Sequence, residues 1–240
     1  MHLGYWPGAA DTDLAAAQAR LDALVLDHAD LRDGQVLLDV GCGIGGTLRA
    51  AGRRNDLVLH GLSPDAAQLR VAREAVPEAS FHEGRAGRLP FANGSVDRVL
   101  SVEAAFHFDS RAGFLCEARR VLRPGGRIVL TDIVPTERMA ELRRSEGPAF
   151  ALERVLQEGI GPWVDLWGTT PGWTELCTPS VHLDITEPTL PSYPCFLGPR
   201  IRAVPGVRLE GDDPMTPAVA LLGWLQETGH VRVVLVVVEH

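Results

Sequence analysis

The chain has 240 residues, 45% of them hydrophobic and 22% charged, and 31 acidic residues against 23 basic ones give a formal net charge of −8. This composition excludes a largely disordered chain, and the negative charge disfavours a nucleic-acid backbone or an anionic membrane as a partner. None of the basic residues is a lysine. Reactions that depend on a Schiff base or a P-loop lysine are therefore excluded.

The first half of the chain alternates helical patterns with apolar runs of strand length. Helices are predicted over 11–31, 47–54, 64–75 and 111–122, and strands over 36–40, 57–62, 79–83, 96–102 and 127–132. This alternation predicts an α/β fold with a doubly wound, mostly parallel sheet. Ligands of such sheets bind in the crevice beyond the carboxyl ends of the strands.

The second half breaks this rhythm. Residues 136–158 have a helical pattern, 159–179 are rich in glycine, proline and tryptophan, 181–185 are strand-like, and 188–217 hold many prolines without a clear period. A helix over 218–226 and a strand over 231–238 follow, and we expect this last strand to lie beside the fifth strand.

The glycine-rich stretch 41–46 follows the first predicted strand directly. Gly41 and Gly43 carry no Cβ and tolerate positive φ, so a ligand can lie against the backbone there. The N–H groups that open the next helix favour polar or negative atoms. The stretch predicts a site for a small polar ligand, although glycine turns of this kind also occur for packing alone.

The four cysteines lie far apart, without the paired spacing of a metal site or a disulfide framework, so we predict no metal. No apolar run approaches the ~20 residues needed to span a bilayer. The first eight residues lack the basic and apolar regions of a secretion signal. We expect a cytoplasmic protein, and the abundance of alanine, arginine and glycine suggests a bacterial source.

Three segments, 36–45, 88–97 and 117–126, resemble successive motifs of the class I S-adenosylmethionine-dependent methyltransferases. The resemblance is to the small-molecule branch, which includes the ubiquinone, sterol and natural-product O- and C-methyltransferases. It implies a Rossmann-like sheet of seven strands with an antiparallel last strand. It also implies one domain, 1–240, divided into an N-terminal lid and helix (1–33), a cofactor-binding core (34–134), a substrate-capping insertion that includes the sixth strand (135–217), and a final helix and strand (218–240).

The same resemblance assigns the S-adenosylmethionine contacts. Asp39 would fix the glycine loop or the ammonium group, Val102 and Glu103 would run beneath the sulfonium, and Tyr5, with Trp6, would close over the site. The remaining predicted contacts are Gly41, Cys42 and Gly43 for the methionine portion, Leu62 and Ser63 for the ribose and adenine, Gln68 as a substitute ribose contact, and Arg85 and Ala86 at the adenine edge.

Two positions depart from the family pattern. The family usually has an acidic residue at the tip of the second strand, where we place Gly61, and an aspartate after the glycine near the adenine, where Arg85 stands. Two charge-assisted hydrogen bonds, each worth roughly 1.5–3 kcal/mol, are then missing.

His107 is the predicted general base, because its position follows the fourth strand and its ordinary pKa of ~6.5 suits proton removal near neutrality. The alternative is a histidine packed between Phe106 and Phe108. Asp132 is predicted either to orient His107 or bind a substrate hydroxyl, or else to cap a turn. The tryptophans at 163, 167 and 173 either form an aromatic wall for the acceptor or anchor the insertion.

These residues predict methyl transfer to an oxygen of a small specialised metabolite. Transfer to carbon, a cyclase or isomerase that keeps the cofactor without transferring its methyl, and a non-catalytic binding protein remain open as alternatives. A dehydrogenase is less consistent with the chain, because the acid that usually binds the ribose in that class is missing. The predicted partner is a small molecule, and a homodimer is left open.

Overall fold

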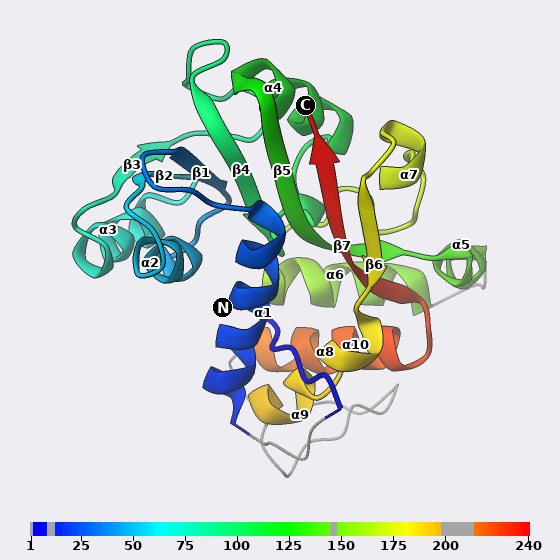
Figure 1. Cartoon of the computed structure of the whole chain (residues 1–240). Helices are drawn as coiled ribbons and strands as arrows, with labels where there is room; N and C mark the ends of the chain where they lie inside the picture. Colours follow the sequence, from blue (N-terminus) through cyan, green and yellow to red (C-terminus); the bar gives the residue numbers. More distant parts are fainter. Residues whose placement is uncertain (1, 9–12, 145–147, 198–213) are drawn as a thin grey trace.

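The computed structural model describes residues 2–8, 13–144, 148–197 and 214–240 of the chain. Seven strands form one sheet in the order β3-β2-β1-β4-β5-β7-β6 (Figure 1). The strands are β1 (Val36–Val40), β2 (Val58–Ser63), β3 (Ser80–Glu83), β4 (Val96–Val102), β5 (Leu122–Pro135), β6 (Val181–Asp184) and β7 (Val231–Glu239). The seven-stranded, mostly parallel sheet predicted from the sequence is confirmed.

The helices are α1 (Leu14–Ala29), α2 (Gly46–Gly52), α3 (Ala66–Ala75), α4 (Arg111–Val121), α5 (Glu137–Arg144), α6 (Pro148–Ile160), α7 (Trp173–Leu176), α8 (Thr186–Thr189), α9 (Ser192–Leu197) and α10 (Met215–Glu227), with a 3-10 turn, η1, at Ala105–His107. Helices cover both faces of the sheet. Successive residues of a strand point to opposite faces, so neighbouring strand residues pack against different helices. Leu37 packs with the cluster that includes α1 and α2, while its neighbour Leu38 packs with the cluster that includes α4.

The last strand enters the sheet where the sequence predicts. β7 runs antiparallel to β5, with Leu130 opposite Val236, and β6 pairs with the other edge of β7. Residues Val233 to Val238 are all buried. A run of this kind without alternation is what a strand covered on both faces requires.

The insertion differs from its predicted outline. Within the segment 136–158, which is predicted to be helical, the structure describes α5 and α6, and residues 145–147 between them lie outside the described residues. The segment 188–197 contains α9 and the end of α8, and the rest of the proline-rich stretch, 198–213, lies outside the described residues. β5 begins at Leu122, before the predicted strand 127–132, and its first residues lie beside a shift in the β4–β5 register.

Candidate active site

The loop between β1 and α2 has the backbone that its glycines allow. Gly41, Gly43 and Gly45 have φ values of 83°, 53° and 81°, a region that favours glycine over residues with a Cβ. A Cβ on Gly41 would also overlap the Cβ of Ala104, at the end of β4. The loop therefore requires glycine both for its conformation and for its close contact with the next strand.

A cavity of about 800 Å³ opens beside this loop, at the carboxyl ends of β1, β2 and β4 and in the loop after β3. It is the crevice expected for a doubly wound sheet. Its lining includes these predicted site residues: Asp39, Gly41, Cys42, Gly43, Leu62, Ser63, Gln68, Arg85, Ala86, Val102, Glu103 and His107. Four different connections thus bring the predicted residues to one space.

Asp39 lies at the floor of this cavity, and its side chain is only 2% exposed. Its Oδ1 atom is buried without a hydrogen-bond partner among the described residues. Burial, with a smaller contribution from the charge of Asp22, raises the pKa of Asp39 to about 7. A buried carboxylate with a free oxygen is suited to a cationic ligand group, because an unpaired buried charge is costly.

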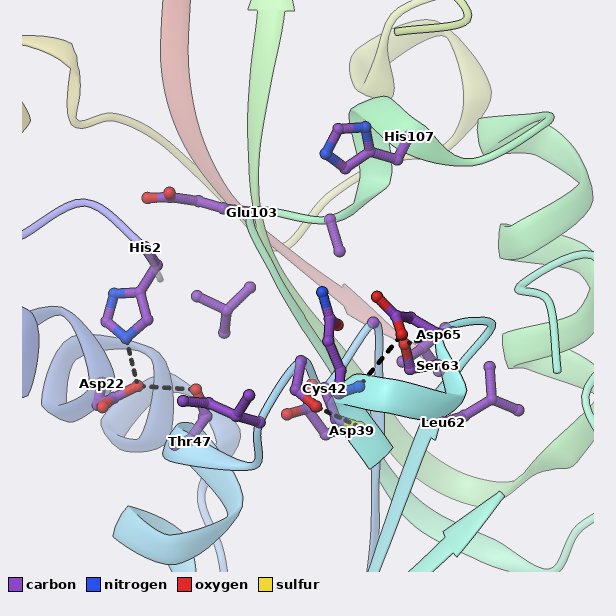
Figure 2. Close-up of a pocket in the computed structure, with 18 of the residues that line it drawn as sticks. His2, Asp22, Asp39, Cys42, Thr47, Leu62, Ser63, Asp65, Glu103 and His107 are labelled. Carbon is purple, nitrogen blue, oxygen red and sulfur yellow. Dashed lines mark hydrogen bonds and ion pairs between the residues drawn. The ribbon is translucent and has the colours of Figure 1, made fainter. Parts of the chain in front are cut away.

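Glu103 lies on the other side of the cavity, directly after β4 (Figure 2). Its φ of 48° is uncommon for a residue other than glycine. Oε2 accepts a hydrogen bond of 2.9 Å from the N–H of Leu3, while Oε1 is buried and has no partner among the described residues. Burial raises the pKa of Glu103. Its free oxygen therefore also favours a donor from a ligand.

Gly61 lies within β2, two residues before its last residue, Ser63. Asp65 caps α3, and its Oδ1 accepts hydrogen bonds from the N–H groups of Ala67 and Gln68 at 2.8 and 3.1 Å. A Cβ on Gly61 would lie 2.7 Å from the ring of Phe81 and 2.8 Å from Cys42 Sγ. The packing around Gly61 therefore leaves no room for a side chain at the position where the family resemblance expects an acid.

The second departure, Arg85, lines the cavity as predicted for the adenine edge. Its guanidinium lies 3.6 Å from Asp109, and both side chains are more than two-thirds exposed. The cavity rim here carries an arginine and an aspartate from two different loops, in place of the single aspartate usual in the family.

His107 ends η1 and faces the cavity from the rim (Figure 2). Its Nδ1 lies 2.7 Å from the carbonyl oxygen of Pro162. Because a carbonyl can only accept, Nδ1 carries the proton, and Nε2 keeps its lone pair in the neutral ring. Burial lowers the pKa of His107, although the Pro162 hydrogen bond and the charge of Asp132 oppose it. The neutral imidazole therefore keeps Nε2 available as a proton acceptor.

Asp132 has a different place from the one predicted. Its carboxylate is fully buried at 0% exposure and accepts hydrogen bonds from Arg111 Nε at 2.8 Å and Trp173 Nε1 at 3.0 Å. Arg111 also pairs with Asp165 of the insertion at 3.0 Å. Asp132 does not line the cavity formed by the described residues, and it neither orients His107 by a hydrogen bond nor caps a turn. It joins the core to the insertion.

The aromatic residues also anchor the insertion and do not form a wall. Trp163 is buried with its ring centroid 5.1 Å from that of Phe106, and Trp173 packs on Phe114. Tyr5, predicted to close over the site, instead lies along α1, where its N–H donates to the carbonyl of Ala17. None of these rings is among the described residues that line the cavity.

The residue that does reach the cavity from the N-terminal segment is His2, which the sequence did not single out. Its Nε2 lies 3.5 Å from Asp22 Oδ1, and the same oxygen accepts a hydrogen bond of 2.8 Å from Thr47 (Figure 2). Asp22 lies on α1 and Thr47 on α2, far from each other in sequence. No local pattern marks such a cluster, because only the packing of α1 against α2 creates it.

A family model described as a methyltransferase domain matches residues 38–130. Similarity to the methyltransferase family is therefore centred on residues 38–130. Methyltransferase GfsG of Streptomyces halstedii is 36% identical over 141 residues, which cover 56% of this chain and 51% of that protein. The (+)-O-methylkolavelool synthase of Herpetosiphon aurantiacus is 33% identical over 163 residues, covering 65% of this chain and 58% of that protein. The chain thus spans about half the length of these relatives.

Solved structures share the fold of the methyltransferase domain and its insertion. Geranyl diphosphate C-methyltransferase from Streptomyces coelicolor, solved with S-adenosyl-L-homocysteine, superposes with a TM-score of 0.72 at 19% identity, over 100% of this chain and 91% of that chain. The [4+2]-cyclase SpnF gives 0.72 at 19% identity, over 100% of this chain and 86% of that chain. The fold predicted from the sequence is confirmed, and the match over 38–130 agrees with the predicted family.

Two further properties concern the described residues alone. None of the helices in that part of the chain is both long and apolar enough to span a membrane. Nor do three or more histidine, cysteine, aspartate or glutamate side chains gather there in a way that would hold a metal ion.

Proposed function

We propose that this protein transfers the methyl group of S-adenosylmethionine to an oxygen atom of a small-molecule acceptor. The observation that carries the proposal is the cavity that joins the glycine loop, with the unpaired carboxylate of Asp39, to the free Nε2 of His107. One of the two relatives is named as a methyltransferase, and the other is named for an O-methylated product.

The residues of the cavity fit this cofactor. The glycine loop has no Cβ atoms at Gly41 and Gly43, so a ligand can approach its backbone closely. Asp39 offers a buried oxygen to a cationic ammonium group. Gln68, in the first turn of α3, has Oε1 4.0 Å from the position of a Cβ on Gly43, so its amide lies beside the loop. With Ser63 at the tip of β2, it supplies neutral hydrogen-bonding groups for a ribose where the family has an acid.

When bound, S-adenosylmethionine supplies an electrophilic methyl group on its sulfonium. The protein's part is to hold the acceptor in line with that methyl, exclude water and remove the acceptor's proton. His107 Nε2 accepts that proton from the hydroxyl as the oxygen attacks, and the Pro162 carbonyl stabilises the imidazolium through Nδ1. The same hydrogen bond ties the insertion to the base, so substrate capping and proton removal involve the same contact.

The direct test is incubation with isotopically methyl-labelled S-adenosylmethionine and a panel of hydroxylated metabolites, followed by mass spectrometry. Gain of one methylene unit that carries the label, on an oxygen of the acceptor, supports the proposal. With an acceptor in hand, His107→Ala lowers turnover at least ~10²-fold and leaves cofactor affinity nearly unchanged. His182→Ala, on the exposed edge strand β6, is the matched control and retains full turnover. Unchanged turnover in His107→Ala would contradict the assigned base.

A second candidate is transfer to carbon or a cyclisation without methyl transfer. The likeness in fold to a C-methyltransferase and to a [4+2]-cyclase motivates it, together with Gly61 and Arg85 in place of the family's acids. Product mass separates the cases, because cyclisation leaves the mass unchanged. Fragmentation then assigns a transferred methyl to carbon or oxygen.

A further inference from the structure

The cavity has an acidic end where three elements each contribute a carboxylate. Asp22 comes from α1, Asp39 from the end of β1, and Glu103 from the residue after β4, and all three line the cavity. Carboxylates that face one space disfavour each other's charge unless cations balance them. Figure 2 shows His2 at this end, with its ring directed toward Asp22 and Thr47.

The contacts of His2 fit a doubly protonated ring. Nδ1 lies 2.8 Å from the carbonyl oxygen of Leu3, and Nε2 lies 3.5 Å from Asp22 Oδ1. Both neighbours are acceptors, so only the imidazolium, with a proton on each nitrogen, satisfies both. In a neutral ring one of the two nitrogens would present a lone pair to an oxygen. Burial lowers the pKa of His2, but Asp22 and Glu103 more than offset it, and the pKa is raised.

The backbone fixes this ring in place. The side chain of Gln18 donates to the carbonyl of His2 at 2.6 Å, the N–H of Leu3 donates to Glu103, and the N–H of Gly4 donates to the buried hydroxyl of Ser192 at 2.8 Å. His2 is therefore held as a positive charge inside the cavity that also contains the glycine loop and Asp39.

We propose that His2 is a charged specificity residue that weakens binding of the sulfonium cofactor relative to its uncharged thioether product. This inference rests on the proposed function. S-adenosylmethionine and S-adenosylhomocysteine share the ammonium and the carboxylate and differ in the positive charge on sulfur. A fixed positive charge in the cavity repels the sulfonium and has no such effect on the thioether.

The charge on His2 depends on pH, and so does this discrimination. At low pH His2 is charged and the preference for S-adenosylmethionine is reduced, whereas above its pKa the ring is neutral and the preference recovers. The groups that face His2 are Asp22 and Gln18 from α1, Asp39 from β1, Thr47 from α2 and Glu103 after β4. Asp39 also titrates near neutrality, but it acts on the ammonium that both ligands carry.

The test is calorimetric measurement of the Kd of both ligands for the wild type, His2→Gln and His182→Gln, at pH 6 and pH 8.5. Comparing proteins at one pH cancels the ligands' own titration, and the ratio of the two Kd values cancels a general folding defect. At pH 6, His2→Gln favours S-adenosylmethionine over S-adenosylhomocysteine by about three- to tenfold more than the wild type does, the range expected for removing one positive charge that is partly screened by water. At pH 8.5 the two proteins agree, and His182→Gln follows the wild type at both pH values.

A ratio that His2→Gln leaves unchanged at pH 6, or changes equally at both pH values, would overturn the proposal. Asp22→Asn is a second test, because without that carboxylate His2 loses its proton at lower pH. The pH at which the ratio of the two Kd values changes is then lower in Asp22→Asn than in the wild type. If neither ligand binds the wild type at either pH, the proposed function fails and the role of His2 fails with it. Binding with a ratio independent of His2 refutes the role of His2 alone.

Discussion

At the scale of single residues, Gly61 shows how packing restricts a position that the family motif assigns to binding. Its missing side chain leaves room for the ring of Phe81 and for Cys42 Sγ. Gly61→Ala therefore destabilises the fold by about 1–3 kcal/mol, the usual result of overpacking a core. Gly87→Ala is the matched control, because no atom lies within 4 Å of a Cβ there. Urea unfolding measures both, and equal stabilities would contradict the packing role.

His107 gives a prediction for pH dependence. The base must be neutral to accept a proton, and burial lowers its pKa below the ordinary value of 6.5. The kcat/KM for the acceptor therefore rises with pH through an apparent pKa below 6.5 and is level from there to mildly alkaline pH. A pH–rate profile on the O-methylated acceptor measures this. An apparent pKa clearly above 6.5, or one that persists in His107→Ala, would assign the proton to another group.

At this scale, sequence reasoning identifies those residues of the cavity that a local pattern marks. The glycine loop and His107 are each recognised from a few neighbouring residues and their distance from a strand end, and both line the cavity. It did not foresee that Phe81 and Cys42 Sγ leave no room for a side chain at Gly61, because these contacts join β2 to other segments of the chain. It missed His2 and Asp22, because their contact joins segments separated by a full helix.

At the scale of elements, the buried pair between Arg111 and Asp132 connects β5, α4 and the insertion. Asp132→Asn leaves Arg111 with one carboxylate partner in place of two and costs about 3 kcal/mol in the free energy of unfolding. Asp27→Asn, which breaks the exposed Arg54–Asp27 pair between α1 and α2, costs less than about 1 kcal/mol. Urea unfolding of the two variants checks the difference. Equal effects would mean that Asp132 does not hold the insertion.

The elements of the core could be predicted because strand-length apolar runs and helical patterns alternate from 36 to 132. The insertion could not, because its short helices depend on tertiary hydrogen bonds more than on their own pattern. Gln226 in α10 accepts a hydrogen bond from Tyr193 of α9 and donates to the carbonyl of Thr186 and the hydroxyl of Thr189, both in α8. These partners are up to 40 residues apart in sequence.

At the scale of the whole molecule, one sheet brings four loops to a single cavity, and the insertion reaches its rim through Pro162 and His107. The sheet order and the antiparallel last strand follow from the family resemblance and are confirmed in the structure. The acidic end depends on where α1 and the N-terminal segment pack, because Asp22 and His2 come from these two segments. We therefore expect the core to bind the cofactor and the N-terminal segment to adjust the relative affinity for S-adenosylmethionine and S-adenosylhomocysteine.

The central claim, that the glycine-loop cavity binds the cofactor through Asp39, is tested by calorimetric titration of S-adenosylmethionine into the wild type and Asp39→Asn at pH 8. The account predicts saturable binding to the wild type and at least about tenfold weaker binding to Asp39→Asn, because a charge-assisted hydrogen bond is lost. Asp184→Asn, on the edge strand β6 and outside the cavity lining, binds like the wild type. No binding to the wild type at millimolar cofactor, or equal affinity in Asp39→Asn, would contradict it.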